Sequence, residues 1–97
     1  MILARVVGSV VSTHKTETIE GIKFLLLEKV KIPSLEGTGD FVVAMDSVGA
    51  GIGEIVFYVS GSSARMTETT KGKPADATIV GIVDNIEKDG KYIYSKD

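Results

Sequence analysis

Side chains capable of acid–base or nucleophilic chemistry are few in this chain. The only histidine, His14, lies in a polar stretch that ends in glycine and is expected to be the exposed tip of a hairpin. The absence of cysteine excludes disulfides, thiolate nucleophiles and thiolate metal sites. Asp46 and Glu54 flank a glycine-rich turn, where turn capping or an ion pair with Arg65 is favoured over a catalytic carboxylate pair. We predict no catalytic residue and no metal site.

The glycine-rich turn itself invites comparison with phosphate-binding loops. Gly49, Gly51 and Gly53 do not have the GxGxxG spacing, no helical pattern follows them, and no GK[ST] motif is present. Glycine can instead take a positive φ or let another backbone approach closely. The spacing therefore predicts a structural turn and no bound cofactor.

A second turn, GSSARMT at residues 61–67, follows an apolar strand pattern. Ser62 or Ser63 could cap a short helix, whereas a nucleophilic role would need a nearby base that the sequence does not offer. Arg65 is one of two arginines against nine lysines. Its planar guanidinium suits a bidentate contact across an interface, and an ordinary surface arginine is an equal alternative.

The aromatic residues and the net charge bear on nucleic-acid and membrane binding. Tyr58, Tyr92 and Tyr94 could stack on bases, but without interleaved basic residues they are better assigned to a core or an interface. A formal net charge of -2 provides no broad attraction to nucleic acid or to an anionic membrane. No signal-peptide pattern opens the chain and no apolar run is long enough for a spanning helix. The absence of cysteine permits a reducing interior such as the cytoplasm.

Short strands must position these turns. Apolar, β-branched runs between glycine and proline signals predict strands at residues 2–12, 23–31, 41–45, 54–60 and 78–86. Gly8 and Gly81 lie inside two of these runs, and Gly8 predicts a bend. Residues 33–40 read as a loop, and Asp89-Gly90 predicts a tight turn that joins the last run to residues 91–94.

The length of 97 residues suits one domain with a single core. The unbroken apolar run at residues 55–59 predicts a strand that meets protein on both faces. Short strands at this spacing, with one small helix after residue 61, predict a mainly β fold: an OB-like closed five-stranded barrel with one short helix and a C-terminal hairpin. Closure, or a partner chain, would protect the strand edges.

Four segments together resemble the EutN/CcmL family of bacterial microcompartment vertex proteins. They are DSVGAGIGEIVFYVSGSSARMT at residues 46–67, the opening ILARVVGSVVST, EGIKFLL and DATIVGIVD. The resemblance covers most of the chain, and VGAGIGE followed by GSSAR at this distance is its most specific part. The chain departs from the family in the loops at residues 13–20 and 33–40 and after Gly90.

This resemblance implies a single shell vertex domain over residues 1–97, assembled as a homo-pentamer at the five-fold vertices of a polyhedral shell in the cytoplasm. It implies a structural protein rather than an enzyme, with hexameric shell proteins as partners and encapsulated enzymes as further ones. It also places the following residues at the subunit interface, the five-fold axis or a pore: Gly49, Ala50, Gly51, Gly53, Ser60, Gly61, Ser62, Ser63, Ala64 and Arg65.

Other hypotheses remain open at this stage. One is an OB-type nucleic-acid-binding module, another is a small enzyme or ligand-binding protein, and a third is the same family in a non-pentameric assembly such as a hexamer. Carboxysomes and catabolic compartments for ethanolamine, propanediol or choline all use this kind of vertex. The lysine-rich, isoleucine-rich composition favours a catabolic compartment, a metabolosome.

Overall fold

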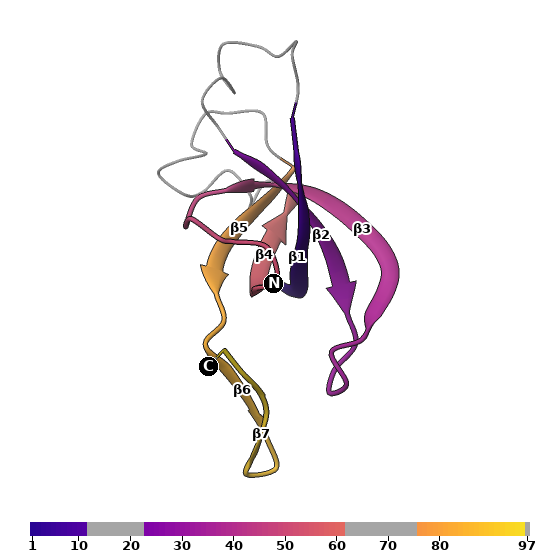
Figure 1. Ribbon diagram of the computed structural model, residues 1–97, viewed down its shortest axis with the longest axis vertical. Helices are drawn as coiled ribbons and strands as arrows, with labels where there is room; N and C mark the ends of the chain where they lie inside the picture. The colour runs from indigo at the N-terminus through magenta and orange to yellow at the C-terminus, as the bar shows by residue number, and fades with distance from the viewer. Residues whose placement is uncertain (12–22, 62–75, 97) are drawn as a thin grey trace.

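The structure is a computed structural model that describes residues 1–11, 23–61 and 76–96. In these ranges the chain forms seven strands: β1 Ile2–Val10, β2 Phe24–Val30, β3 Gly37–Asp46, β4 Ile55–Ser60, β5 Ala77–Ile82, β6 Asn85–Lys88 and β7 Lys91–Ser95. The first five close a barrel in the order β1-β2-β3-β5-β4, and β6 and β7 form a separate hairpin (Figure 1). The predicted closed barrel and C-terminal hairpin are therefore confirmed. No helix within the described ranges is long and apolar enough to cross a membrane.

Alternating side chains of the five strands fill the barrel, as the two-residue period of a strand requires. These core side chains are Ala4, Val6, Leu25, Leu27, Ala44, Ala50, Val56, Tyr58, Ala77 and Ile79. Val42 and Ile82 pack against them. All but Ala50 come from barrel strands, and Ala50 enters the core from the connection between β3 and β4.

The apolar run of β4 is buried on its core face and only partly buried on the other, so its sequence-based prediction is confirmed in part. Val56 and Tyr58 point into the core, while Ile55, on the opposite face, is also fully buried. Phe57 lies opposite Gly81 of β5, and a Cβ added at Gly81 would overlap the Phe57 ring. Glycine at this position therefore leaves room for the aromatic ring, which a larger residue would have to displace.

The predicted bend at Gly8 is present. The register of β1 against β2 shifts between Val6 and Gly8, which marks a bulge. The strand ends at Val10, two residues before the predicted boundary at Ser12.

The predicted start of the third strand, residue 41, is wrong. Strand β3 begins at Gly37, inside the segment expected to be a loop, and pairs there with Val30. Glu28 explains the difference, because its carboxylate accepts the Gly39 N–H at 3.0 Å and occupies the space that a side chain at Gly37 would need. Gly39 has φ +87°, so these glycines allow an irregular strand where their residue type indicated a loop.

The predicted strand over residues 78–86 is also wrong at its C-terminal end. Strand β5 ends at Ile82, and Ile86 belongs to β6, where it pairs with Tyr94. The Val83 N–H still donates to the Ile55 carbonyl at 2.8 Å, and beyond it the chain leaves the barrel.

The predicted tight turn at Asp89-Gly90 is confirmed. Both residues have positive φ, 54° and 79°, which is the combination that a two-residue type I′ turn uses. The predicted short helix after residue 61 lies outside the described residues.

We expect Gly81→Ala to destabilise the fold by about 1–3 kcal/mol, because the new methyl group must displace the Phe57 ring from a packed position. Gly8→Ala is the matched control, since its methyl group would lie at an ordinary 3.8 Å from Leu26. Chemical denaturation at one fixed protein concentration measures both free energies of unfolding. Equal stability of the two variants would contradict the packing argument.

Candidate functional site

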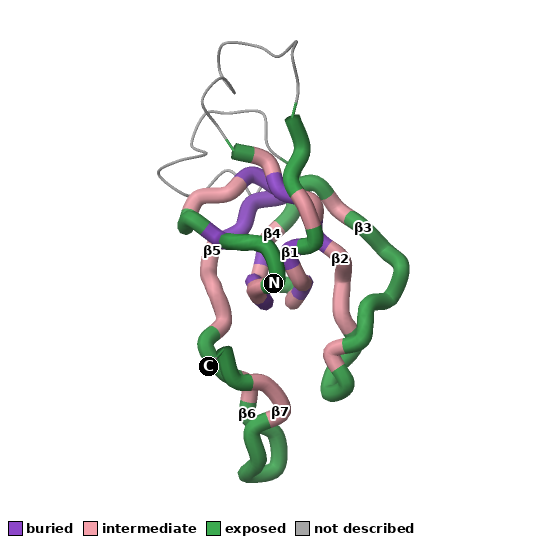
Figure 2. Tube along the Cα trace, viewed as in Figure 1, coloured by how far each residue is buried: buried purple, intermediate pink, exposed green. Residues whose placement is uncertain are grey.

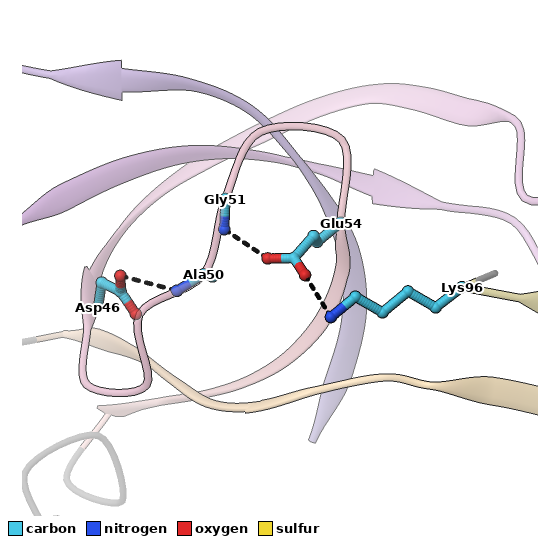
Figure 3. Close-up of polar contacts among 5 residues, drawn as sticks. All are labelled: Asp46, Ala50, Gly51, Glu54 and Lys96. Carbon is cyan, nitrogen blue, oxygen red and sulfur yellow. Dashed lines mark hydrogen bonds and ion pairs between the residues drawn. The ribbon is translucent and has the colours of Figure 1, made fainter.

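The turn between β3 and β4, residues 46–54 and hereafter the glycine turn, is capped by Asp46. The Asp46 carboxylate accepts three backbone N–H groups at 3.0 Å, from Val48 and Gly49 on Oδ1 and from Ala50 on Oδ2. Figure 3 shows the carboxylate facing the Ala50 amide. The predicted capping role of Asp46 is thereby confirmed.

The glycine turn is fastened to two strands of the barrel. The Gly53 N–H donates to the Val6 carbonyl at 2.8 Å, and the Val6 N–H donates to the Glu54 carbonyl at 2.9 Å. On the other side, the Ser47 hydroxyl donates to the Ile79 carbonyl of β5. The turn therefore extends the pairing of the barrel rather than standing apart from it.

The three alternating glycines serve different purposes. Gly49 and Gly53 have φ of +78° and +90°, in the region that favours glycine, although a Cβ at either would meet open space. Gly51 does not have a positive φ, and its N–H donates to Glu54 Oε1. A Cβ there would lie 3.4 Å from that oxygen.

Glu54 joins the glycine turn to the C-terminal end of the chain. Its carboxylate accepts the Gly51 N–H through one oxygen and forms an ion pair with Lys96 Nζ at 2.7 Å through the other (Figure 3). The Lys96 contact, followed by the Gly51 N–H, lowers the pKa of Glu54 below its ordinary value. Sequence reasoning named Arg65 as the ion-pair partner; Arg65 lies outside the described residues, and the partner observed is Lys96.

The residues predicted for an interface or axis do not all share one surface. Gly49, Gly51 and Gly53 are exposed along the glycine turn, whereas the side chain of Ala50 is buried in the barrel core. The surface that this part of the chain offers to a partner is therefore mostly backbone.

Ser60 and Gly61 lie at the opposite end of β4 from the glycine turn, and both are exposed. Gly61 has φ +65°, and its N–H donates to the Asp76 carbonyl at 2.8 Å. The six residues of β4 separate the glycine turn from Gly61 by about 20 Å at the usual rise of a strand. Within one chain the glycine turn and the Ser60–Gly61 end of β4 are two separate surfaces. Ser62, Ser63, Ala64 and Arg65 lie outside the described residues.

Sequence reasoning missed two exposed apolar features. Ile52, at the tip of the glycine turn, is 71% exposed, and an isoleucine among glycines in a turn was the available signal. The second feature is a groove of about 420 Å³, called the β3 groove. It is lined by Ile2, Lys29, Phe41, Val42, Val43, Tyr58, Ser60, Gly61, Asp76 and Ala77. Among the residues that the structure describes, no group of three or more His, Cys, Asp or Glu side chains could hold a metal ion.

The family model for "Ethanolamine utilisation protein EutN/carboxysome" matches residues 1–84. The chain belongs to the EutN/CcmL family. It is 43% identical to the carboxysome shell vertex protein CcmL of Thermosynechococcus vestitus, over 99% of this chain and 96% of that protein. It is 46% identical to the bacterial microcompartment shell vertex protein PduN of Salmonella typhimurium, over 89% of this chain and 98% of that protein.

A solved member of the EutN/CcmL family extends the likeness to the fold. The pentameric microcompartment shell protein GrpN of Rhodospirillum rubrum superposes with a TM-score of 0.77 at 43% identity, covering 91% of this chain and 98% of GrpN. The family resemblance inferred from the residues is therefore confirmed.

Replacing Asp46 by alanine should lower the free energy of unfolding by about 1–3 kcal/mol, because three backbone N–H groups lose a charged acceptor. Asp46→Asn should cost less, since one amide oxygen can still accept. Asp40→Ala, an exposed position on β3, is the matched control and should be nearly neutral. Denaturation curves measure the free energies of unfolding of the three variants. An Asp46→Ala variant that is as stable as the control would contradict the capping role.

Glu54→Gln should weaken the pH dependence of stability on the acid side. Because the pKa of Glu54 is lower in the folded state than its ordinary value of 4.5, its stabilising effect is complete above 4.5 and is lost as the pH falls through the lowered pKa. Denaturation of both proteins from neutral pH downward measures this, and their stability difference should shrink on acidification. Lys96→Met, which removes the main cause of the shift, should reduce the pH dependence in the same direction. A difference independent of pH would contradict the assignment.

Proposed function

We propose that this protein is a structural shell protein that forms cyclic pentamers at the five-fold vertices of a bacterial microcompartment, as one domain over residues 1–97. The observation that carries the proposal is the likeness to the pentameric shell protein GrpN, at 43% identity over nearly the whole of both chains. The two relatives named as shell vertex proteins support it. The protein would then reside in the shell, inside the cytoplasm.

The geometry of a closed shell explains why such a protein is needed. Hexagonal tiles form a flat sheet, so a polyhedron requires five-fold units at its corners. A cyclic ring repeats one head-to-tail contact, which joins two different surfaces of the same chain. The glycine turn and the far end of β4 are two such separate surfaces, and exposed Ile52 gives the first an apolar side chain to bury.

We place the interface, the five-fold axis or its pore at these two surfaces. On the first lie Gly49, Gly51 and Gly53, with the Ala50 backbone between them, and on the second lie Ser60 and Gly61. Our proposal for the interface or axis also includes Ser62, Ser63, Ala64 and Arg65, which follow in the sequence outside the described residues. Glycine and serine support this placement because small residues let several copies of one backbone segment converge where larger side chains would collide.

We propose no catalytic activity for this chain. The carboxylates of Asp46 and Glu54 are occupied by backbone N–H groups and by Lys96, so they hold the turn in place and are not disposed to transfer protons. The contacts of both carboxylates therefore support a structural role for Asp46 and Glu54.

The proposed partners are hexameric shell proteins, whose edges a vertex pentamer would meet, and encapsulated enzymes. A catabolic compartment is our proposal for the setting, and it rests on the lysine-rich composition. The similarity to a carboxysome vertex protein is of the same order as the similarity to PduN, so it favours neither class.

Native mass spectrometry of the purified chain should give an assembly of five times the 10.3 kDa monomer. A six-fold mass would contradict the pentamer while leaving the family unchanged. A monomer under all conditions would contradict the vertex role, and a salt-dependent nucleic-acid binding assay would then test the OB-type binding module.

Ile52→Asp should shift the assembly toward smaller species in the same measurement, because a charged carboxylate replaces an apolar side chain at the proposed interface. Ile32→Asp, at a 49% exposed isoleucine between β2 and β3, is the matched control and should leave the mass unchanged. An intact pentamer with Ile52→Asp would exclude the tip of the glycine turn from the interface.

A further inference from the structure

The β6–β7 hairpin projects away from the barrel along the long axis of the molecule (Figure 1). Its strands pack chiefly against each other. Its connections to the rest of the chain lie at its base, where the Lys96 N–H donates to the Asp84 carbonyl at 2.8 Å and Lys96 Nζ pairs with Glu54. The family model matches residues 1–84, which contain the barrel, and ends before the hairpin.

A lone two-stranded hairpin is at best marginally stable in water, so packing against another surface would stabilise this one. Its tip carries Tyr92, whose side chain is 68% exposed, beside Lys91 and directly opposite Glu87. Figure 2 shows the tip of the hairpin as exposed throughout. The hairpin thus presents one large aromatic ring with Glu87 on the same face, while Lys91, the adjacent residue of β7, lies on the other face.

The β3 groove has the matching chemistry. Its walls include Phe41 and Val43, which are 56% and 47% exposed although both are apolar. Its lining also contains one cation and one anion, Lys29 and Asp76. At about 420 Å³ the groove has the size of a small-ligand pocket and exceeds a single aromatic ring.

We propose that the hairpin of one copy docks into the β3 groove of a neighbouring copy in the ring, with Tyr92 as its anchor. The Tyr92 ring packs on Phe41 and Val43, as buried tyrosines do at interface hot spots. Glu87, which lies on the same face of the hairpin as Tyr92, then faces Lys29, so this charged pair is complementary. The proposal rests on the proposed pentamer and names one of its contacts.

The occupant is a second copy because the chain's own hairpin leads away from its own groove. Strand β5 begins at Ala77, which lines the groove, and ends at Ile82, roughly 17 Å further on. The hairpin starts beyond that far end and continues in the same direction (Figure 1). In a cyclic assembly each copy then docks its hairpin into the groove of one neighbour and binds the hairpin of the other neighbour in its own groove.

Cross-linking between two single-cysteine chains tests the contact, because the natural chain has no cysteine. A Tyr92→Cys chain and a Val43→Cys chain, carrying different tags, are co-expressed and treated with a short bis-maleimide. Ile32→Cys replaces Val43→Cys in the control, since Ile32 and Val43 are similarly exposed, 49% and 47%. We expect a cross-linked dimer that carries both tags when Tyr92→Cys is paired with Val43→Cys. We expect no such dimer when Tyr92→Cys is paired with Ile32→Cys. In addition, Glu87→Lys should shift the native mass toward smaller species, and adding Lys29→Glu should restore it.

The two proposals fail in different ways. A wild-type pentamer without preferential cross-linking at Val43, or without rescue by the reversed pair, would overturn the docking of the hairpin and leave the pentamer standing. A wild-type protein that is not pentameric would overturn the proposed function first. Cross-linking only between two Tyr92→Cys chains would overturn the groove as the receptor.

Discussion

The barrel is closed by a short parallel contact between β3 and β5. In the described chain this contact comprises two residue pairs, Met45 with Thr78 and Asp46 with Ile79. Parallel neighbours cannot be joined by a hairpin, so a long crossover must connect them, and it begins with the glycine turn and β4. Asp46 is both the last residue of β3 and the cap of that turn, and Ser47 bonds to the Ile79 carbonyl. Barrel closure and turn geometry therefore depend on the same two residues.

Closure leaves a small barrel whose outer surface is not uniformly polar. The chain has no disulfide to assist its stability, and the core is built largely from alanine, valine, leucine and isoleucine. Phe41 and Val43 remain exposed on β3, as does Ile52 on the glycine turn. Exposed apolar side chains grouped on different sides of one chain are typical of a protein that buries them against partners. A head-to-tail ring covers both sides with a single repeated contact.

Much of the barrel could be predicted because periodicity and glycine chemistry are local signals. The apolar run of β4, the bulge at Gly8 and the turn at Asp89-Gly90 follow from neighbouring residues alone. The start of β3 could not be predicted in this way, because it depends on a carboxylate of another strand. Glu28 accepts the Gly39 N–H, and the segment that was expected to be a loop forms a strand. The pairing of Glu54 with Lys96 was missed for the same reason, since the two lie far apart in the sequence. Interface residues depend on a second chain, which no local pattern describes.

Glu54 also links the two parts of the molecule that we assign to assembly. Its carboxylate holds the Gly51 amide of the glycine turn and the Lys96 side chain at the base of the hairpin, while its carbonyl bonds to Val6 of β1. The turn and the base of the hairpin are therefore held by the same residue. Because the angle between neighbours in a ring depends on every contact they share, fixing the turn and the hairpin to a common point restricts that angle.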